Sequence, residues 1–236
     1  MCCRVAQGSS KNRIKNKVKA KGRAPEVTPR LNLAPTQEAV VAVYESNGIR
    51  LEAMRWGLIP SWARGKSIGP KLANARAETI DEKPSFREPF QRRRCLLPVD
   101  GYYEWETRPI GKHPVYYSMY DSNLFCLAGL WETWTTPEHV TAMELPGLGR
   151  PGTETLHTFT IITTTPNCLT KRVHKRMPVI VHANDYELWL SLESQVDDLK
   201  GLLKPFDAEM MQEHYVTPRM NNPRFEGPEC IQPVAL

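Results

Sequence analysis

The chain opens Met1-Cys2-Cys3-Arg4-Val5, so removal of Met1 would leave a free α-amine and a thiol on one residue, Cys2. Methionine aminopeptidase generally removes Met before a small residue. An α-amine titrates near ~7.7–8.0 and a lysine near ~10.4, so a terminal amine is more often unprotonated at neutral pH. An amine captures an aldehyde as a Schiff base, on which the adjacent thiol can close to form a thiazolidine. Cys2 is therefore a candidate aldehyde trap, although a Met-Cys start taken alone is more often incidental.

Glu104 is a candidate general acid and base. Tyr102-Tyr103-Glu104-Trp105 sets a carboxylate among aromatic residues on an expected strand. Burial in such surroundings raises the pKa of a carboxyl group toward neutrality, where it can both donate and accept a proton. Without further support, an exposed carboxylate or half of an ion pair is the commoner role for such a residue.

His174 and Asn74 are candidates of a second kind. An unperturbed histidine has a pKa near ~6.5 and can act as acid or base at cellular pH, although a lone histidine is usually structural. An asparagine amide both donates and accepts hydrogen bonds, so Asn74 could orient the Cys2 amine or a sugar without adding charge. The alternative for Asn74 is a residue of an ordinary turn.

Two arginines lie beside these candidates. Arg4 is two residues from Cys2, and Arg76 is two residues from Asn74, so each pair shares a face if the chain is extended. A guanidinium fork matches a phosphate with two hydrogen bonds. Both arginines are therefore candidate phosphate clamps.

Tryptophan offers a stacking surface for bases. Trp62 lies on an expected loop before Arg64-Gly65-Lys66, whereas Trp56 lies in a β-rich run and is expected in the core. Stacking of a base on an aromatic ring contributes about 1–3 kcal/mol and does not depend on sequence. Trp62 is the better candidate for contact with bases, with Pro60 as a neighbouring wedge.

The elements that must position these residues are mostly strands. Glu38–Glu45 and Gly48–Arg55 flank an Asn-Gly pair that favours a hairpin. Helices are expected at Asp185–Leu192 and Gln195–Leu203, with one or two further turns within Phe206–Tyr215. The sequence predicts an α+β fold with a mostly antiparallel, barrel-like β-sheet core and flanking helices. Six further strand-like runs are Cys95–Val99, Tyr102–Glu106, Val115–Tyr120, Leu124–Trp131, Thr158–Thr165 and Val179–His182, and Thr136–Thr155 is expected to be a surface loop.

Length and composition favour a single domain over residues 1–236, since 41% of 236 residues are hydrophobic. The net charge of +5 arises from residues 1–30, which hold nine Lys or Arg and one acidic residue; the remainder holds 22 basic and 25 acidic residues. The segment 9–30 is expected to be flexible, with Ile14 and Val18 as its only apolar pair at helical spacing. Residues 11–23 are a phosphate-binding arm, a nuclear localisation signal or a solvated loop.

The six cysteines predict no metal site and no disulfide framework, since they include no C-x-x-C pair and no cluster with histidine at zinc spacing. No apolar run is long enough to cross a membrane, and no signal peptide is evident. The chain is expected to be a soluble intracellular monomer without cofactor or membrane partner.

Seven sequence tags are spread along most of the chain. They are Met1-Cys2-Cys3-Arg4, Leu31-Asn32-Leu33-Ala34-Pro35-Thr36, Arg55-Trp56-Gly57-Leu58-Ile59-Pro60, Asn74-Ala75-Arg76-Ala77-Glu78-Thr79, Asp100-Gly101-Tyr102-Tyr103-Glu104-Trp105, His174-Lys175-Arg176-Met177-Pro178-Val179 and Ile231-Gln232-Pro233-Val234. In type and order these tags resemble the SOS response-associated peptidase (SRAP) family, whose eukaryotic members were also described as hydroxymethylcytosine-binding proteins.

The resemblance implies a sensor that shields abasic sites during the DNA damage response. Such a protein crosslinks its N-terminal cysteine, here Cys2, to the ring-opened sugar aldehyde in single-stranded DNA through a thiazolidine. It implies catalytic roles for Asn74, Glu104 and His174. It also places DNA contacts at Asn32 and Thr163, beside those expected for Arg4, Arg76 and Trp62. The expected partner is single-stranded DNA with an abasic site, including junctions with duplex.

The resemblance leaves other activities open. A Schiff base on the sugar allows β-elimination, and a terminal cysteine could remove Met1 or reverse its own crosslink. The alternatives are a cysteine peptidase and a non-catalytic reader of single-stranded or modified DNA. The family usually has glycine where this chain has Cys3, which adds a side chain at a position of close DNA approach. The expected location is the nucleus in a eukaryote and the cytoplasm or nucleoid in a bacterium.

Overall fold

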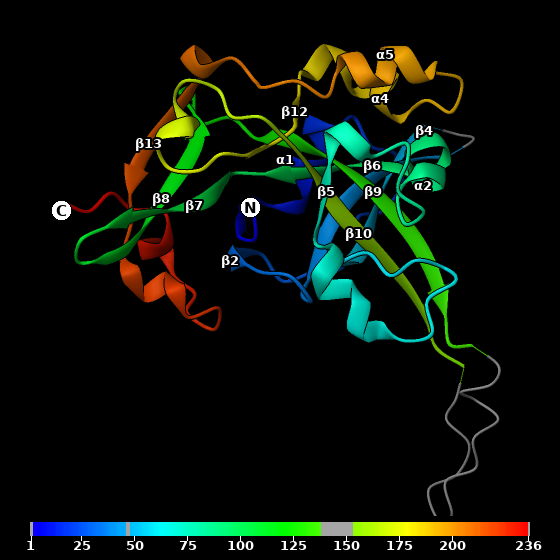
Figure 1. Cartoon of the computed structure of the whole chain (residues 1–236), viewed down its shortest axis with the longest axis horizontal. Coiled ribbons are helices and arrows are strands. Elements are labelled where there is room, and N and C mark those ends of the chain that lie inside the picture. Colours follow the sequence, from blue (N-terminus) through cyan, green and yellow to red (C-terminus); the bar gives the residue numbers. More distant parts are fainter. Residues whose placement is uncertain (1, 46–47, 138–152, 236) are drawn as a thin grey trace, which may run out of the picture.

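The computed structural model describes residues 2–45, 48–137 and 153–235. It contains two sheets and several short helices, of which α4 and α5 lie together at the top of the view in Figure 1. The strands are β1 (Val5–Gln7), β2 (Arg30–Leu33), β3 (Glu38–Glu45), β4 (Gly48–Trp56), β5 (Asn74–Arg76), β6 (Arg94–Val99), β7 (Gly101–Arg108), β8 (Gly111–Met119), β9 (Phe125–Thr135), β10 (Thr155–Thr164), β11 (Met177–Pro178), β12 (Ile180–Val181) and β13 (Met211–Tyr215). The α-helices are α1 (Lys11–Lys17), α2 (Arg87–Arg92), α4 (Tyr186–Leu190) and α5 (Val196–Gly201), and the 3-10 helices are η1 (Lys66–Leu72), η2 (Ala77–Thr79), η3 (Thr170–Arg172), η4 (Ala183–Asp185), η5 (Ala208–Met210), η6 (Pro218–Asn221) and η7 (Pro228–Cys230).

The larger sheet closes into a barrel. Its strands follow the order β10-β4-β3-β6-β9, and β9 pairs again with β10. All of these pairings are antiparallel except β4 with β10, which is parallel. Closure leaves no free edge among the five strands. The predicted α+β fold with a mostly antiparallel, barrel-like core is confirmed.

The smaller sheet is antiparallel and has the order β13-β8-β7-β1-β2. One face carries Val5, Tyr102 and Tyr117, which pack with Val41 and Phe159 of the barrel in one apolar cluster. The core therefore lies between the sheet and the barrel, and β1 takes an interior position in the sheet.

Gln7 ties β1 to the barrel. The Gln7 side chain is 4% exposed. Its amide nitrogen donates to the carbonyl oxygens of Val40 and Pro98, at 2.8 Å each. Its amide oxygen accepts from the Val40 backbone nitrogen at 2.9 Å. Since all of these polar groups are satisfied, the buried glutamine fixes the short strand in place.

The basic segment 9–30 is partly helical in the structure. Ser10 caps the start of α1, and its hydroxyl accepts from the Arg13 backbone nitrogen. Ile14 and Val18 are buried against the barrel, in the same cluster as Leu96. The pair at helical spacing thus supplies the contact that holds this charged helix to the rest of the protein.

Most expected strands are present, with somewhat different ends. β3 has the predicted bounds, and α4 and α5 fall within the two predicted helices. Of the one or two helical turns predicted within Phe206–Tyr215, one is present as η5, whereas Met211–Tyr215 forms β13 and pairs with β8. The predicted loop at 136–155 lies mostly outside the described residues, and β10 begins at its last residue.

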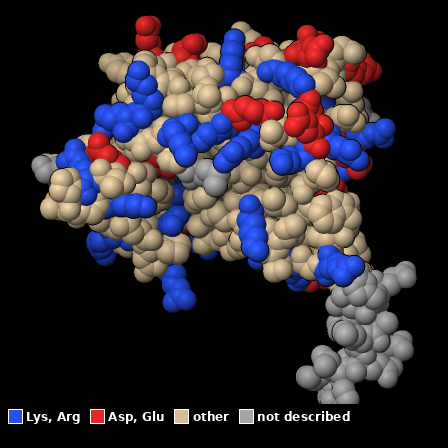
Figure 2. Space-filling model, in the orientation of Figure 1, with Lys and Arg blue, Asp and Glu red and all other residues tan. Residues whose placement is uncertain are grey.

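Charged side chains are unevenly distributed on the surface of the protein. Figure 2 shows acidic side chains of this face gathered mostly over α4 and α5, whereas basic side chains lie across the whole face. The region below the two helices is therefore richer in positive side chains. In the part of the chain that the structure describes, no helix has the length and apolar character needed to cross a membrane.

Gly57 directly follows β4, at the point where the barrel closes onto β10. Its φ of +116° is unfavourable for a residue with a side chain. Its backbone nitrogen donates to Phe159 O of β10 at 2.8 Å. A Cβ at this position would lie 2.8 Å from the Gly69 carbonyl oxygen, a backbone atom that has little freedom to move.

Gly57→Ala is expected to lower the free energy of unfolding by about 2 kcal/mol or more, because it adds backbone strain and a clash. Urea denaturation measures the change. Gly65→Ala is the matched control, since Gly65 is extended and nothing lies within 4 Å of its added Cβ. The control is expected to change stability by less than about 0.5 kcal/mol. Equal effects at the two positions would contradict this interpretation of Gly57.

Candidate active site

The pairing of β1 with β7 positions Cys2. Val5 faces Tyr102 in the ladder, and the Tyr103 backbone nitrogen donates to Arg4 O at 3.0 Å. Because β1 lies between two neighbours, the residues just before it run alongside β7. Cys2 is thereby carried into the core between the sheet and the barrel, where it is 1% exposed.

The Cys2 thiol is neutral in this environment. Burial raises its pKa well above the usual value, and the nearby Glu104 and Cys3 raise it further. Burial also raises the pKa of the Cys3 thiol, which is only partly covered. A neutral thiol is a weak nucleophile, so Cys2 needs a base to react.

Asn74 holds the backbone of the first residues. It begins β5, which pairs in parallel with β10 and places Asn74 beside Ile161. Its amide nitrogen donates to Cys2 O at 2.8 Å and contacts Cys3 Sγ at 3.5 Å. Its amide oxygen is buried and has no hydrogen-bond partner among the described residues. Buried acceptors normally have a hydrogen-bond donor as partner, so the Asn74 amide oxygen is suited to accept a hydrogen bond from a group close to Cys2.

Glu104 lies on β7 and is 5% exposed. Burial raises the pKa of this carboxyl group, and the nearby His174 opposes the increase. His174 Nδ1 is 3.9 Å from Glu104 Oε1. A carboxyl group whose pKa is shifted toward neutrality can both donate and accept a proton.

His174 lies between η3 and β11, on a segment that comes back toward β7. Its Nδ1 is 3.1 Å from the Arg176 backbone nitrogen and 3.0 Å from the Arg176 carbonyl oxygen. A backbone N–H can only donate, so it fits the neutral ring with Nδ1 as acceptor. The carbonyl can only accept, so it fits a ring that carries a proton on Nδ1. Nδ1 thus has a backbone partner at Arg176 whether it accepts or donates.

A cleft of about 440 Å³ lies beside Glu104 and His174. Three of its lining residues had no role in the sequence analysis: Trp105, Lys112 and Asn221. Trp105 Nε1 donates to Asn221 Oδ1 at 2.7 Å, which brings the C-terminal part of the chain to the cleft. No sequence signal links Lys112 or Asn221 to Glu104, because only the folding of β7, β8 and η6 brings them together. The cleft is lined by Cys3, Arg4, Glu104, Trp105, Lys112, His174 and Asn221.

Arg4 is held at the rim of the cleft by buried groups. Its guanidinium donates to Asn32 Oδ1 at 2.7 Å and to Met220 O at 3.0 Å. Its central carbon lies 5.6 Å from the centre of the Trp105 ring. Desolvation lowers the pKa of this guanidinium, which nevertheless stays charged at neutral pH.

Asn32 is fully buried and anchors the C-terminal segment. Its amide nitrogen lies within hydrogen-bond distance of the carbonyl oxygens of Met220, Asn222 and Phe225. Its amide oxygen accepts from Arg4. In this conformation Asn32 can act on a ligand only through Arg4.

The other candidate DNA contacts differ in exposure. Arg76 follows Asn74 in β5 and is exposed, and Trp62 is 61% exposed on its loop. Thr163 is fully buried, and its hydroxyl donates to Ala75 O at 3.2 Å. Trp56, expected in the core, is fully buried.

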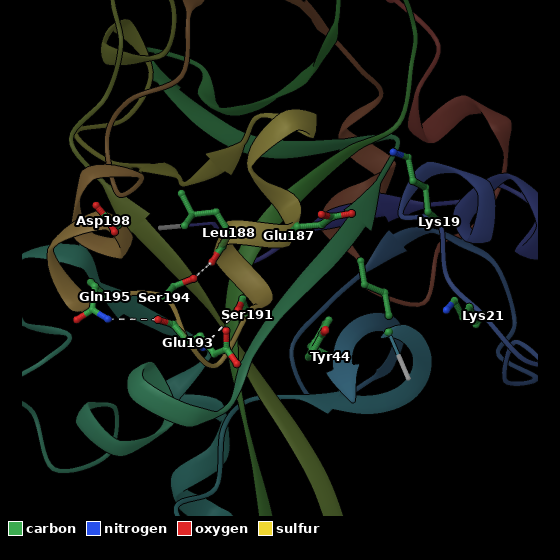
Figure 3. Close-up of a pocket in the computed structure, with 12 residues that line it drawn as sticks. Lys19, Lys21, Tyr44, Glu187, Leu188, Ser191, Glu193, Ser194, Gln195 and Asp198 are labelled. Carbon is green, nitrogen blue, oxygen red and sulfur yellow. Dashed lines mark hydrogen bonds between the residues drawn. The ribbon is translucent and has the colours of Figure 1, made fainter. Parts of the chain in front are cut away.

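A larger hollow of about 760 Å³ lies elsewhere, between α4, α5 and the loop after α1 (Figure 3). Lys19 and Lys21 border one side of it, and Glu187 and Asp198 border the other. None of the candidate catalytic residues lines it. Among the described residues, no group of three or more His, Cys, Asp or Glu is arranged to hold a metal ion.

Comparison with known proteins adds independent information. The family model named SOS response associated peptidase (SRAP) matches residues 1–223. The abasic site processing protein YoqW of Bacillus subtilis is 42% identical over 209 residues, which cover 88% of this chain and 87% of that protein. The abasic site processing protein HMCES of Gallus gallus is 30% identical over 208 residues, or 78% of this chain and 57% of that protein. A crystal structure of a Bacteroides thetaiotaomicron protein superposes with a TM-score of 0.82 at 27% identity, covering 99% of this chain and 100% of that one.

Proposed function

This chain belongs to the SRAP family of abasic site processing proteins, and we propose that its mature N-terminal Cys2 captures the aldehyde of an abasic site in single-stranded DNA as a thiazolidine. The observation that supports this proposal most strongly is the convergence of Asn74, Glu104 and His174 around the first residues of the chain. These groups come from three parts of the chain: β5, β7 and the segment between η3 and β11.

The proposed reaction forms two bonds to the sugar aldehyde carbon and releases one water. The Cys2 α-amine adds to the aldehyde and gives a carbinolamine, which loses water to become a Schiff base. The Cys2 thiol then adds to the same carbon, its proton passes to the nitrogen, and the five-membered ring closes. The buried oxygen of Asn74 is suited to accept a hydrogen bond from the α-amine and to direct it at the aldehyde.

Glu104 and His174 would carry the proton transfers. An abasic sugar is mostly a closed hemiacetal, so a proton must be moved to open the ring and another to expel the carbinolamine hydroxyl. The raised pKa of Glu104 favours a protonated carboxyl that can donate, and the carboxylate so formed can take the proton of the neutral Cys2 thiol. His174 would assist at the sugar oxygen. The Schiff base would also permit β-elimination, and reversal of the same steps would release the DNA.

DNA would approach the rim of the cleft. Arg4 and Arg76 are suited to the phosphates beside the lesion, and Trp62 is suited to stacking on a neighbouring base. Asn32 and Thr163, which are fully buried, would act by holding Arg4 and β5. A single strand is the expected substrate, since its bases can leave the stack without loss of pairing.

Trp62→Ala is expected to weaken binding of single-stranded DNA by about 1–3 kcal/mol, because one stacking contact is lost. Fluorescence anisotropy with a labelled oligonucleotide at fixed salt measures this change. Tyr120→Ala is the control, because it removes an aromatic side chain of similar exposure, 75%, that borders a different hollow beside Lys17 and Phe206. An equal loss of affinity in both variants would argue against a specific stacking site at Trp62.

The experiment that tests the function is a denaturing gel of the Met1-processed protein with a single-stranded oligonucleotide that carries one abasic site. A slow band that survives heat and detergent without borohydride is expected, and an oligonucleotide with intact bases gives none. Mass spectrometry first confirms the Cys2 terminus. If this protein forms no band, the proposal of a thiazolidine crosslink is wrong.

A further inference from the structure

His174 lies at the middle of a short segment, Arg172 to Arg176, that crosses from one sheet to the other. The arginine at each end of this segment bonds a different sheet. This paired attachment differs from an ordinary loop, because both ends are fixed by charged side chains rather than by backbone pairing alone.

Arg172 attaches the segment to the smaller sheet. Its guanidinium donates to Glu106 Oε1 of β7 at 2.7 Å and also to Glu213 of β13. Glu106 is two residues from Glu104, so both carboxyl groups lie on the same face of β7. The side chains of Glu106 and Glu213 are 16% and 19% exposed.

Tyr215 and Arg108 hold Glu106 in place. The Tyr215 hydroxyl donates to Glu106 Oε2 at 2.6 Å, and Arg108 Nε donates to the same oxygen at 2.7 Å. These bonds lower the pKa of Glu106 to about 2, with Tyr215 as the first cause. Glu106 is therefore ionised at every pH at which the protein would work, and it remains a partner for Arg172.

Arg176 attaches the other end of the segment to the barrel. Its guanidinium bonds the carbonyl oxygen of Thr163 in β10, and also both carboxylate oxygens of Glu78 in η2, at 2.6 and 2.9 Å. His174 thus lies between two fixed points, one on each sheet.

We propose that Arg172 is a positioning residue that holds His174 against Glu104 by bonding Glu106 and Glu213. The inference rests on the proposed function, in which these two groups transfer protons. Partly exposed ion pairs contribute little to stability on their own. A displacement of about 1 Å in a reacting group, however, can slow a reaction by about a hundredfold. The effect of Arg172 is therefore expected in the rate of reaction rather than in folding.

The test compares Arg172→Met with Lys171→Met, which removes an equal charge from the adjacent exposed residue. The crosslinking rate constant at saturating DNA is expected to fall about ten- to a hundredfold in Arg172→Met. The DNA concentration at half saturation and the rate of Lys171→Met are expected to match the wild type. Arg172→Lys keeps the charge but cannot bond two carboxylates in the same way. Its crosslinking rate constant is expected to lie between those of the wild type and Arg172→Met.

A double-mutant cycle separates positioning from a general structural effect. If Arg172 acts through His174, Arg172→Met causes no further loss of rate when His174→Ala is already present. An equal loss in both backgrounds, or a wild-type rate in Arg172→Met, would overturn the proposal.

Histidine NMR signals of the free protein give a second measurement that needs no DNA. The His174 ring signal, assigned by its absence from the His174→Ala spectrum, is expected to shift in Arg172→Met and to stay in place in Lys171→Met. If the wild type forms no crosslink, the proposed function fails, and this spectrum alone decides the role of Arg172. An unchanged His174 signal in Arg172→Met would then overturn the proposal that Arg172 positions His174.

Discussion

The Cys2→Ala protein is expected to form no heat-stable crosslink to single-stranded DNA with an abasic site, although it binds that DNA as tightly as the wild type. Alanine is also small, so Met1 is removed from the variant and a terminal α-amine remains. The amine can still form a Schiff base, but no thiol is present to close the ring. A denaturing gel without borohydride is therefore expected to be blank, and borohydride is expected to restore a band.

Cys3→Ala is the matched control, because it removes the adjacent thiol of the same cleft and leaves Cys2 intact. This variant is expected to crosslink, since only Cys2 would carry the free α-amine. A heat-stable band from Cys2→Ala would show that the Cys2 thiol is not needed, and loss of the band from Cys3→Ala alone would show that the Cys3 thiol is needed. Either result would contradict the proposed chemistry.

Glu104→Gln is expected to slow crosslinking by about 10²–10⁴-fold, which is the usual effect of removing a general acid or base. Single-turnover kinetics on gels measure the rate. Glu132 is another buried carboxyl whose pKa is raised by burial, but it lies outside the cleft lining. Glu132→Gln is therefore expected to leave the crosslinking rate unchanged.

The same Glu104 substitution is expected to stabilise the protein in a pH-dependent way. Burial raises the pKa of Glu104 in the folded protein, so the folded state binds more protons than the unfolded chain above the usual value near ~4.3. The contribution of this group to stability is therefore lost as pH rises through the raised pKa. Glutamine does not titrate, so the gain in Tm of Glu104→Gln is expected to grow from pH 4 to pH 8. If Glu104→Gln is less stable than the wild type throughout this range, burial of the Glu104 carboxylate does not lower the stability of the folded protein, and the prediction is wrong.

Local sequence patterns predicted the strands well, since β-rich runs such as Glu38–Glu45 carry their own signal. They failed at Met211–Tyr215, because this strand has mixed polarity and depends on its pairing with β8. They also did not predict β1, which is only three residues long and is stabilised by neighbours on both sides.

The candidate site was predicted from motifs, and the structure brings Asn74, Glu104 and His174 to the first residues of the chain. No local pattern predicted that the Asn32 amide bonds carbonyl groups of the C-terminal segment, or that Arg172 bonds two strands. Such contacts join residues that are far apart in the chain, so their cause lies in the topology rather than in any local pattern.

The interior position of β1 has a mechanical consequence. Cys2 is separated from β1 by only two residues, and β1 is bonded to β2 on one side, to β7 on the other and to the barrel through Gln7. A load applied to DNA attached at Cys2 would pull along this strand. It would be resisted in shear by several bonds at once, whereas an edge strand could be peeled away one bond at a time. DNA attached at Cys2, as proposed, would thus be anchored in the middle of the smaller sheet rather than at a loosely tethered end.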